Sequence, residues 1–239
     1  MDFFLTLYLA HVIGDFPLQT DAIFRLKQKS TWGVTVHVLV CTLVNIVLLA
    51  QMLEHLFIWL TILFIAVIHI TLDRTKMFLA VFRDKDGLGY FFLDQGLHLL
   101  SLMLAAWYVL QVLPPSAIAI WLPRPWIISL TALFIAAFAI PPVTFYVQRS
   151  LFTKRDAIRN MPFPSCKQRL PGALIRFCAT LGLILGGWYV LLYLSNLLSY
   201  IFPTPVPSKL LKYRIAETGV NLAITLFCGV FAWHLLQLP

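Results

Sequence analysis

The stretch Leu56–Asp73 reads LFIWLTILFIAVIHITLD. It carries no ionisable side chain until its end, where His69 and Asp73 stand one helical turn apart. An apolar run of this length is typical of a transmembrane helix. A titratable group inside such a helix is costly and is by default functional. This stretch therefore predicts both a membrane fold and the position of a site.

The composition of the whole chain agrees with this interpretation. Of its 239 residues, 60% are hydrophobic and 12% are charged, and the mean hydropathy is +0.86. These values exclude an ordinary soluble domain. Strand-like alternation is absent, so helices are expected to cross the bilayer. We predict an all-α membrane protein, a polytopic helical bundle of about seven transmembrane helices at 2–20, 32–53, 56–73, 89–112, 125–147, 172–198 and 215–238.

The predicted spans divide into two regions. Residues 1–112 form a four-helix membrane core that carries all the motifs described below. Residues 113–239 form a three-helix membrane region with a basic cytoplasmic loop at 148–171. Pro141 and Pro142 lie inside the span 125–147 and are expected to kink or break it.

Lysine and arginine predict the orientation of the chain. They gather in the loops at 21–31, 74–88 and 148–171, whereas the opposite loops carry few. The basic loops should face the cytoplasm, in the cytoplasmic (inner) membrane or another internal bacterial membrane. The net charge of +8 is then explained by topology and anionic lipid. We expect membrane lipids as partners and no nucleic acid; other membrane proteins and a second copy of the chain stay open.

Histidine and aspartate recur at i,i+4 spacing near the span ends, which puts each pair on one helix face. The pairs are His11 with Asp15, His69 with Asp73, and Asp94 with His98. The third pair has the reverse order and lies in a span that runs the other way. In all three, the carboxylate is therefore nearer the cytoplasm and the imidazole about 5–6 Å deeper. His37 falls in the same layer.

Imidazoles and carboxylates at one depth of a helical bundle are typical of a divalent metal centre. Zinc is the first expectation, with iron and manganese as alternatives. The set exceeds one tetrahedral site, so it predicts either two metals or one metal with supporting groups. Asp94 is a ligand or the catalytic base that activates water. The candidate ligands are His11, Asp15, His37, His69, Asp73, Asp94 and His98.

Other interpretations of these groups stay open. Asp and His chains inside membranes also serve as proton or ion pathways. Haem or another tetrapyrrole needs histidine ligands but not the paired aspartates. Single intramembrane polar residues often only join helices by hydrogen bonds.

Three neighbouring polar residues are candidates for substrate binding. Gln19 follows Asp15 by one helical turn, and Gln95 is adjacent to Asp94. Both can orient ligands or bind substrate. Lys76 follows Asp73 and is expected to pair with a lipid phosphate.

Four separated motifs appear in order over residues 1–105. They are His11-Val-Ile-Gly-Asp15-Phe-Pro-Leu-Gln19, then His37, then His69-x-x-x-Asp73-Arg-x-Lys76, and finally Asp94-Gln95-x-x-His98. This pattern resembles an uncharacterised bacterial integral membrane protein family, catalogued as a domain of unknown function. The resemblance implies a polar core without an assigned substrate.

The leading hypothesis is a membrane-embedded, metal-dependent enzyme, a hydrolase acting on a lipid or amphiphile at the cytoplasmic interface. A metal-ion or proton-coupled transporter is the first alternative. A non-catalytic subunit of a larger membrane complex, binding pigment or haem, is the second. The chain has no Walker loop, H-E-x-x-H or G-x-S-x-G motif, which disfavours the common ATPase, metalloprotease and serine-hydrolase mechanisms. The four cysteines are dispersed without C-x-x-C spacing, so we expect them unpaired.

Overall fold

The computed structural model describes residues 1–83, 87–151, 163–193 and 211–237, and all regular elements in these ranges are helical. The predicted all-α class is confirmed. The chain forms two compact units, Met1–Ile127 and Ile128–Pro239. The sequence placed the division at 112–113. The boundary in the structure falls inside a helix, so each unit is described by itself.

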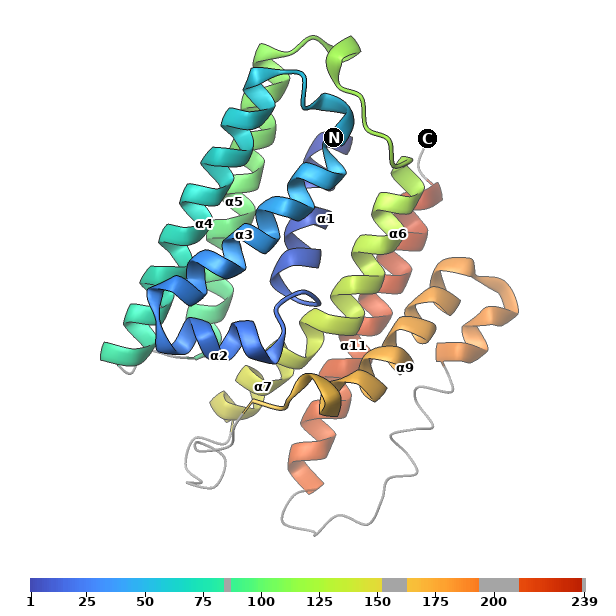
Figure 1. The fold of residues 1–239 in the computed structure, drawn as a ribbon. Coiled ribbons are helices and arrows are strands. Elements are labelled where there is room, and N and C mark those ends of the chain that lie inside the picture. Colours follow the sequence, from blue (N-terminus) through green and yellow to red (C-terminus); the bar gives the residue numbers. More distant parts are fainter. Residues whose placement is uncertain (84–86, 152–162, 194–210, 238–239) are drawn as a thin grey trace. The chain divides into compact units, whose positions relative to one another are not determined.

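Unit 1 (Met1–Ile127) is a helical bundle with one helix across its end (Figure 1). α1 packs against α3 and α5, α3 packs against α4, and α4 packs against α5. Figure 1 shows α2 crossing the end of the bundle where α1 ends and α3 begins. The elements are α1 (Asp2–Asp15), α2 (Asp21–Lys29), α3 (Thr31–Leu48), η1 (Ala50–Met52), α4 (Leu56–Arg83), α5 (Leu88–Val112), η2 (Pro115–Ala117) and the start of α6 (Arg124–Phe134).

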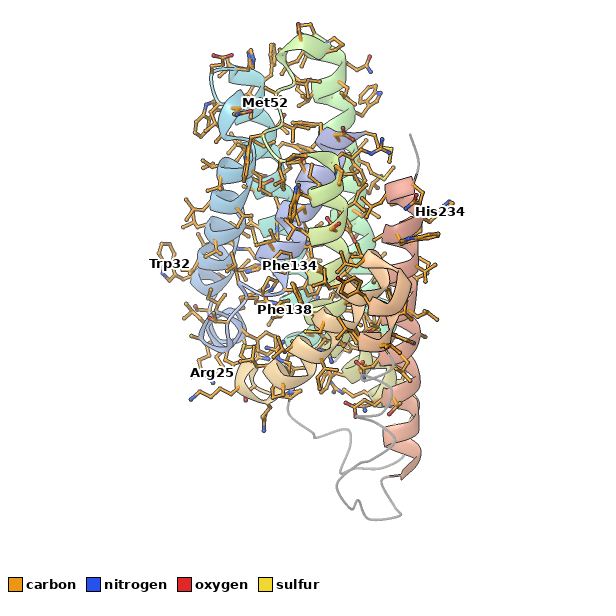
Figure 2. The ribbon with its side chains drawn as sticks, turned by 90° about the vertical axis from the view of Figure 1, so that its right-hand side faces the viewer. Arg25, Trp32, Met52, Phe134, Phe138 and His234 are labelled. Carbon is orange, nitrogen blue, oxygen red and sulfur yellow. The ribbon has the colours of Figure 1, made fainter. Side chains whose placement is uncertain are left out.

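The two ends of unit 1 differ in chemistry. One end holds a cluster of fully buried apolar side chains, among them Leu7, Met52, Ile58 and Val109. Figure 2 labels Met52 at this end and Arg25, on α2, at the other. The predicted site residues belong to the α2 end, since they lie late in α1 and α4 and early in α3 and α5. The unit therefore has an apolar end and a polar end.

Two local sequence signals build the polar end. α1 ends at Asp15, shortly before Pro17, so the expected span 2–20 was too long. The segment 21–31 was expected to be a basic loop, but it contains α2. Thr20 caps this helix by accepting the Ile23 N–H at 3.4 Å, and Asp21 in the first turn suits the helix dipole. Sequence composition did not distinguish α2 from a loop, because this helix is short and has basic residues, Lys27 and Lys29, in its last turn.

Within the described ranges, five helices are long and apolar enough to cross a membrane, at Thr31–Leu48, Leu56–Ala80, Leu88–Val112, Arg124–Ser150 and Glu217–Gln237. These correspond to five of the seven predicted spans. The other two predicted spans correspond to α1, which has only 14 residues, and α9 (Cys166–Leu185), which carries Lys167, Arg169 and Arg176. The chain is a helical membrane protein.

Unit 2 (Ile128–Pro239) continues α6 into a π-helical turn, η3 (Ile135–Ala139), followed by α7 (Ile140–Leu151). Pro141 and Pro142 explain this turn, because neither has an N–H to continue the α-helical pattern. The unit also contains α9, η4 (Gly187–Val190) and α11 (Leu211–Gln237). The expected span 172–198 is interrupted at Gly186, whose φ of 69° is the left-handed region that favours glycine. The central part of the expected loop 148–171 lies outside the described residues.

Candidate metal centre

All the predicted ligand residues are buried at the polar end of unit 1, with relative exposures of 0% for His37 to 7% for Asp94. The imidazoles form one cluster. The ring centroids of His69 and His98 lie 4.5 Å apart, those of His37 and His69 lie 5.2 Å apart, and those of His11 and His98 lie 5.0 Å apart. α1, α3, α4 and α5 each contribute one of these rings. The helices thus bring together residues that are up to 87 positions apart, from His11 to His98.

Four donor atoms from three helices have the spacing of metal ligands. Nε2 of His37 lies 3.0 Å from Oδ1 of Asp15 and 3.7 Å from Oδ2 of Asp73. Nε2 of His69 lies 3.7 Å from each of these two oxygens. A tetrahedral ion with bonds of about 2.0–2.1 Å separates its ligands by about 3.4 Å. Four of the six ligand-to-ligand distances of such a site are therefore close to the required value.

A second part of the cluster is built around Asp94. Its Oδ2 accepts hydrogen bonds from Lys76 Nζ at 2.7 Å and from Gln95 Nε2 at 3.2 Å. Gln95 Nε2 also donates to Oδ2 of Asp15 at 3.1 Å. Gln95 thereby links the Asp94 carboxylate to the four-donor group. We expected Lys76 to pair with a lipid phosphate; in the structure it pairs with Asp94.

The tautomer of His98 follows from its backbone contact. Nδ1 of His98 lies 2.8 Å from the carbonyl oxygen of Asp94. A carbonyl only accepts, so Nδ1 carries the proton and donates it. Nε2 of His98 is then a lone-pair donor directed away from that contact. This arrangement is the usual way a protein orients a metal-ligating or proton-accepting histidine.

Several buried imidazole nitrogens have no hydrogen-bond partner within the described part of the chain. They are Nε2 of His11, Nε2 of His69, Nε2 of His98 and Nδ1 of His37. Buried polar atoms are nearly always hydrogen-bonded, and exceptions call for an explanation such as an ion. Among the residues that the structure describes, two groups of buried side chains could hold a metal ion: His37 with Cys41 and His69, and His69 with Asp73 and His98.

Lys27 is a site residue that the sequence analysis missed. Its Nζ lies 2.6 Å from Oδ2 of Asp73 and donates to Oε1 of Gln19 at 2.8 Å. Gln19 in turn donates to the backbone oxygen of Asp15 at 3.0 Å. Gln19, a candidate for substrate binding, thus contacts Lys27 and the end of α1. The sequence analysis used Lys27 only as one of the basic residues that predict the orientation of the chain in the membrane.

The position of Lys27 depends on close packing between α2 and α3. A Cβ built on Gly33, in the first turn of α3, would overlap the Leu26 carbonyl and the Lys27 nitrogen. Only glycine allows α2 to lie this near α3. The packing places the lysine ammonium, whose side chain is 9% exposed, against Asp73, whose side chain is 4% exposed.

Cys41 is the second residue that the sequence analysis missed. Its Sγ lies 3.7 Å from Nε2 of His37, and the residue is 3% exposed. Cysteine and histidine here share the same i,i+4 spacing as the His/Asp pairs. That spacing was the signal that could have found it. None of the four cysteines forms a disulfide, as expected.

The formal charge of the cluster is small. With neutral imidazoles, Asp15, Asp73 and Asp94 contribute −3 and Lys27 and Lys76 contribute +2, so the sum is −1. Buried charges persist in proteins when they are paired or coordinate metals. The remaining negative charge favours a cation over an anion in this space.

Comparison with known proteins identifies the family but no activity. A family model described as "Protein of unknown function (DUF3307)" matches residues 3–128. No curated protein and no solved structure matches the chain. The matched range coincides with unit 1 and includes every ligand candidate. The chain therefore belongs to the DUF3307 family of proteins of unknown function.

Proposed function

We propose that unit 1 is a membrane-embedded, metal-dependent hydrolase that acts on a lipid or amphiphilic ester at the cytoplasmic interface. One observation carries this proposal. Donor atoms of Asp15, His37, His69 and Asp73 converge at ligand spacing in a buried cluster. Imidazole nitrogens of His11, His69 and His98 in this cluster also have no hydrogen bond from any residue that the structure describes.

The chemistry follows from the donor set. Imidazole and carboxylate ligands suit zinc first, with iron and manganese as alternatives. When bound, such an ion acts as a Lewis acid that activates water and polarises an ester or phosphoryl group. His37 and His69 would hold the ion, and Gln95 orients the Asp15 carboxylate by donating a hydrogen bond to its Oδ2.

The proton-accepting role passes to His98 in this proposal. Asp94 was the candidate base, but its Oδ2 already accepts from Lys76 and Gln95. Nε2 of His98 is buried and has no hydrogen bond from the part of the chain that the structure describes, and the Nδ1–H of the same ring donates to the Asp94 carbonyl. An imidazole in this state accepts a proton as a general base. Asp94 then positions Lys76 through its carboxylate and His98 through its backbone oxygen.

The membrane position supports an amphiphilic substrate. The polar end carries exposed Arg25 and Lys29 on α2 and the exposed Trp32 at the start of α3. Figure 2 shows Trp32 projecting away from the ribbon. Tryptophan at such a position is typical of the headgroup region, and flanking cations are typical of the cytoplasmic side. We propose that α1 and α9 are also membrane-embedded, which gives seven membrane helices.

Transport is the weaker candidate because the other end of unit 1 is apolar. Phe3, Leu7, Met52 and Ile58 are at most 1% exposed there. The buried polar residues beyond the site each donate to a carbonyl of their own helix. They are Thr6 to Asp2, Asn45 to Cys41, Thr61 to Phe57 and Ser101 to His98. A pathway needs polar groups that contact one another across helices.

The test compares metal-free and zinc-loaded protein on defined vesicles. The purified protein is stripped with a chelator, and one half is reloaded with zinc. Both are incubated with vesicles of mixed neutral and anionic phospholipids, and the released products are measured by mass spectrometry. We expect hydrolysis only in the reloaded sample and its loss in His98→Gln. Full activity of the stripped protein, or intact lipids in both samples, contradicts the proposal.

A further inference from the structure

We infer that Cys41 is a ligand of the same centre, together with His37 and His69, and that the site therefore selects a thiophilic divalent ion such as zinc or cobalt. This inference rests on the proposed metal centre and adds the chemical class of the ion. It predicts discrimination against magnesium and calcium, which take oxygen ligands.

The distance between the sulfur and the imidazole supports direct ligation. Sγ of Cys41 lies 3.7 Å from Nε2 of His37. An ion bonded to sulfur at about 2.3 Å and to nitrogen at about 2.0–2.1 Å separates the two ligands by about 3.6 Å in tetrahedral geometry. Donor atoms of Cys41, His37 and His69 all lie within 4.8 Å of one another.

Burial and packing hold the sulfur in this place. A Cβ built on Gly14 would lie 2.7 Å from the Cys41 Sγ, so α1 contacts α3 at the cysteine. Asp15, the next residue, directs Oδ1 to 3.0 Å from the same His37 nitrogen. The sulfur and this carboxylate therefore approach His37 from neighbouring positions. Nε2 of His69, in a residue only 3% exposed, has no hydrogen-bond partner among the described residues and is the third ligand atom.

The fourth ligand is Asp15 rather than Asp73, because the Lys27 ammonium lies against the Asp73 carboxylate and opposes a second cation there. Oδ1 of Asp15 lies 3.0 Å from the His37 Nε2 and 3.7 Å from the His69 Nε2. Oδ2 of Asp73 has Lys27 Nζ at 2.6 Å. The resulting set is one thiolate, two imidazoles and one carboxylate, a combination that suits zinc.

The charges balance when Cys41 binds as a thiolate. Binding releases the thiol proton to the solvent, the sulfur lone pair forms the bond to the ion, and no oxidation state changes. Three carboxylates and one thiolate give −4, and Lys27 and Lys76 give +2. The sum of −2 is neutralised by one divalent ion. A buried centre without net charge avoids the desolvation penalty of an uncompensated ion.

The experiment is cobalt substitution of the full-length protein in detergent, read by absorption. Cobalt in a tetrahedral site gives visible d–d bands, and a thiolate ligand adds a sulfur-to-cobalt charge-transfer band in the near ultraviolet. We expect both in the parent. Cys41→Ser should lose the charge-transfer band, retain d–d bands and bind zinc more weakly by at least about 100-fold, since changes to residues that merely support a ligand already cost 10–100-fold. Cys228→Ser, which changes a buried cysteine of unit 2, should keep both sets of bands.

The parent spectrum decides the matter even if Cys41→Ser fails to fold. Stoichiometric cobalt binding with d–d bands but without charge transfer overturns the role of Cys41 and leaves the proposed metal centre intact. Charge transfer that survives in Cys41→Ser likewise overturns it. Absence of any cobalt or zinc binding overturns both the inference and the proposed function.

Discussion

Both units bury titratable side chains among apolar helices, but they satisfy them differently. In unit 2, Arg176 is 5% exposed, and its Nε and Nη2 donate to the carbonyls of Ala136 and Ala137 at 2.8 Å each. Its Nη1 donates to Oδ1 of Asn221 at 3.3 Å. In unit 1, buried nitrogens of His11, His69 and His98 have no hydrogen bond among the described residues.

The burial of Arg176 is explained by the sequence of the neighbouring segment, η3 and the start of α7. Pro141 follows Ala137 by four positions and Ala136 by five, and it has no N–H to offer either carbonyl. Arg176 supplies the missing donors. Its burial therefore has a complete structural explanation, whereas the imidazole cluster of unit 1 has ring nitrogens that no described residue binds. These ring nitrogens without a hydrogen bond among the described residues, rather than burial alone, identify the candidate site in unit 1.

The largest effect is expected from removing a shared ligand of unit 1. His69→Ala should weaken zinc binding by more than about 100-fold, since changes to residues that merely support a ligand already cost 10–100-fold. Affinity is measured by competition with a chromophoric chelator. The control is His55→Ala, because the His55 side chain is 28% exposed and lies between η1 and α4. Equal affinities for the two variants would exclude His69 as a ligand.

The next effect tests the close packing that seats Lys27. Gly33→Ala should lower the free energy of unfolding by about 3 kcal/mol, because its Cβ would overlap backbone atoms of α2. Gly96→Ala, in helix α5 with nothing within 4 Å of its Cβ, should raise it by about 0.5–1 kcal/mol. Denaturant unfolding in detergent, followed by circular dichroism, measures both. An unchanged free energy of unfolding in Gly33→Ala would show that the fold does not depend on the close packing of α2 against α3.

Removal of Arg176 should lower the stability of the protein without changing its affinity for the metal. Arg176→Met should lower the free energy of unfolding by about 2 kcal/mol, because it leaves the Ala136 and Ala137 carbonyls without these donors. Its zinc affinity should equal that of the parent. Arg25→Met, at an exposed position of α2, controls for the loss of one positive charge. A changed zinc affinity in Arg176→Met would break the contrast between the two units.

The smallest effect is expected from removing Lys27, whose ammonium group lies inside the site. Lys27→Met should raise zinc affinity about tenfold, which is about 1.4 kcal/mol, because the ammonium contacts Asp73 at 2.6 Å and repels a metal ion. Lys29→Met, exposed on the same helix, should leave the affinity unchanged. The comparison uses the same chelator competition. A lower affinity in Lys27→Met would mean that the lysine holds Asp73 in place for the ion.

Hydropathy and spacing predicted the parts of the fold that depend on one helix at a time. The span expected at 89–112 corresponds to α5 (Leu88–Val112), and the i,i+4 rule chose residues that the structure brings into one buried cluster. Both inferences rest on the period of a single helix. The bounds failed where a proline or glycine intervened, after Asp15 and at Gly186.

The contacts between helices could not be predicted in the same way. Lys27 reaches Asp73 only because Gly33 admits α2 against α3. Arg176 meets Ala136 only through the crossing of α9 and η3. A single sequence does not encode crossing angles in its periodicity, so these partners stayed hidden. Cys41 had a usable signal, its i,i+4 spacing from His37, which a search for His/Asp pairs alone passes over.

The metal centre is tested most simply by elemental analysis of the detergent-purified protein beside a double variant of two assigned ligands, His37→Ala, His69→Ala. We expect near-stoichiometric zinc, iron or manganese in the parent and its loss in the double variant, with both proteins equally helical by circular dichroism. Absence of these metals from the parent, even after incubation with each ion, would exclude the metal centre and favour a proton relay or a structural polar core.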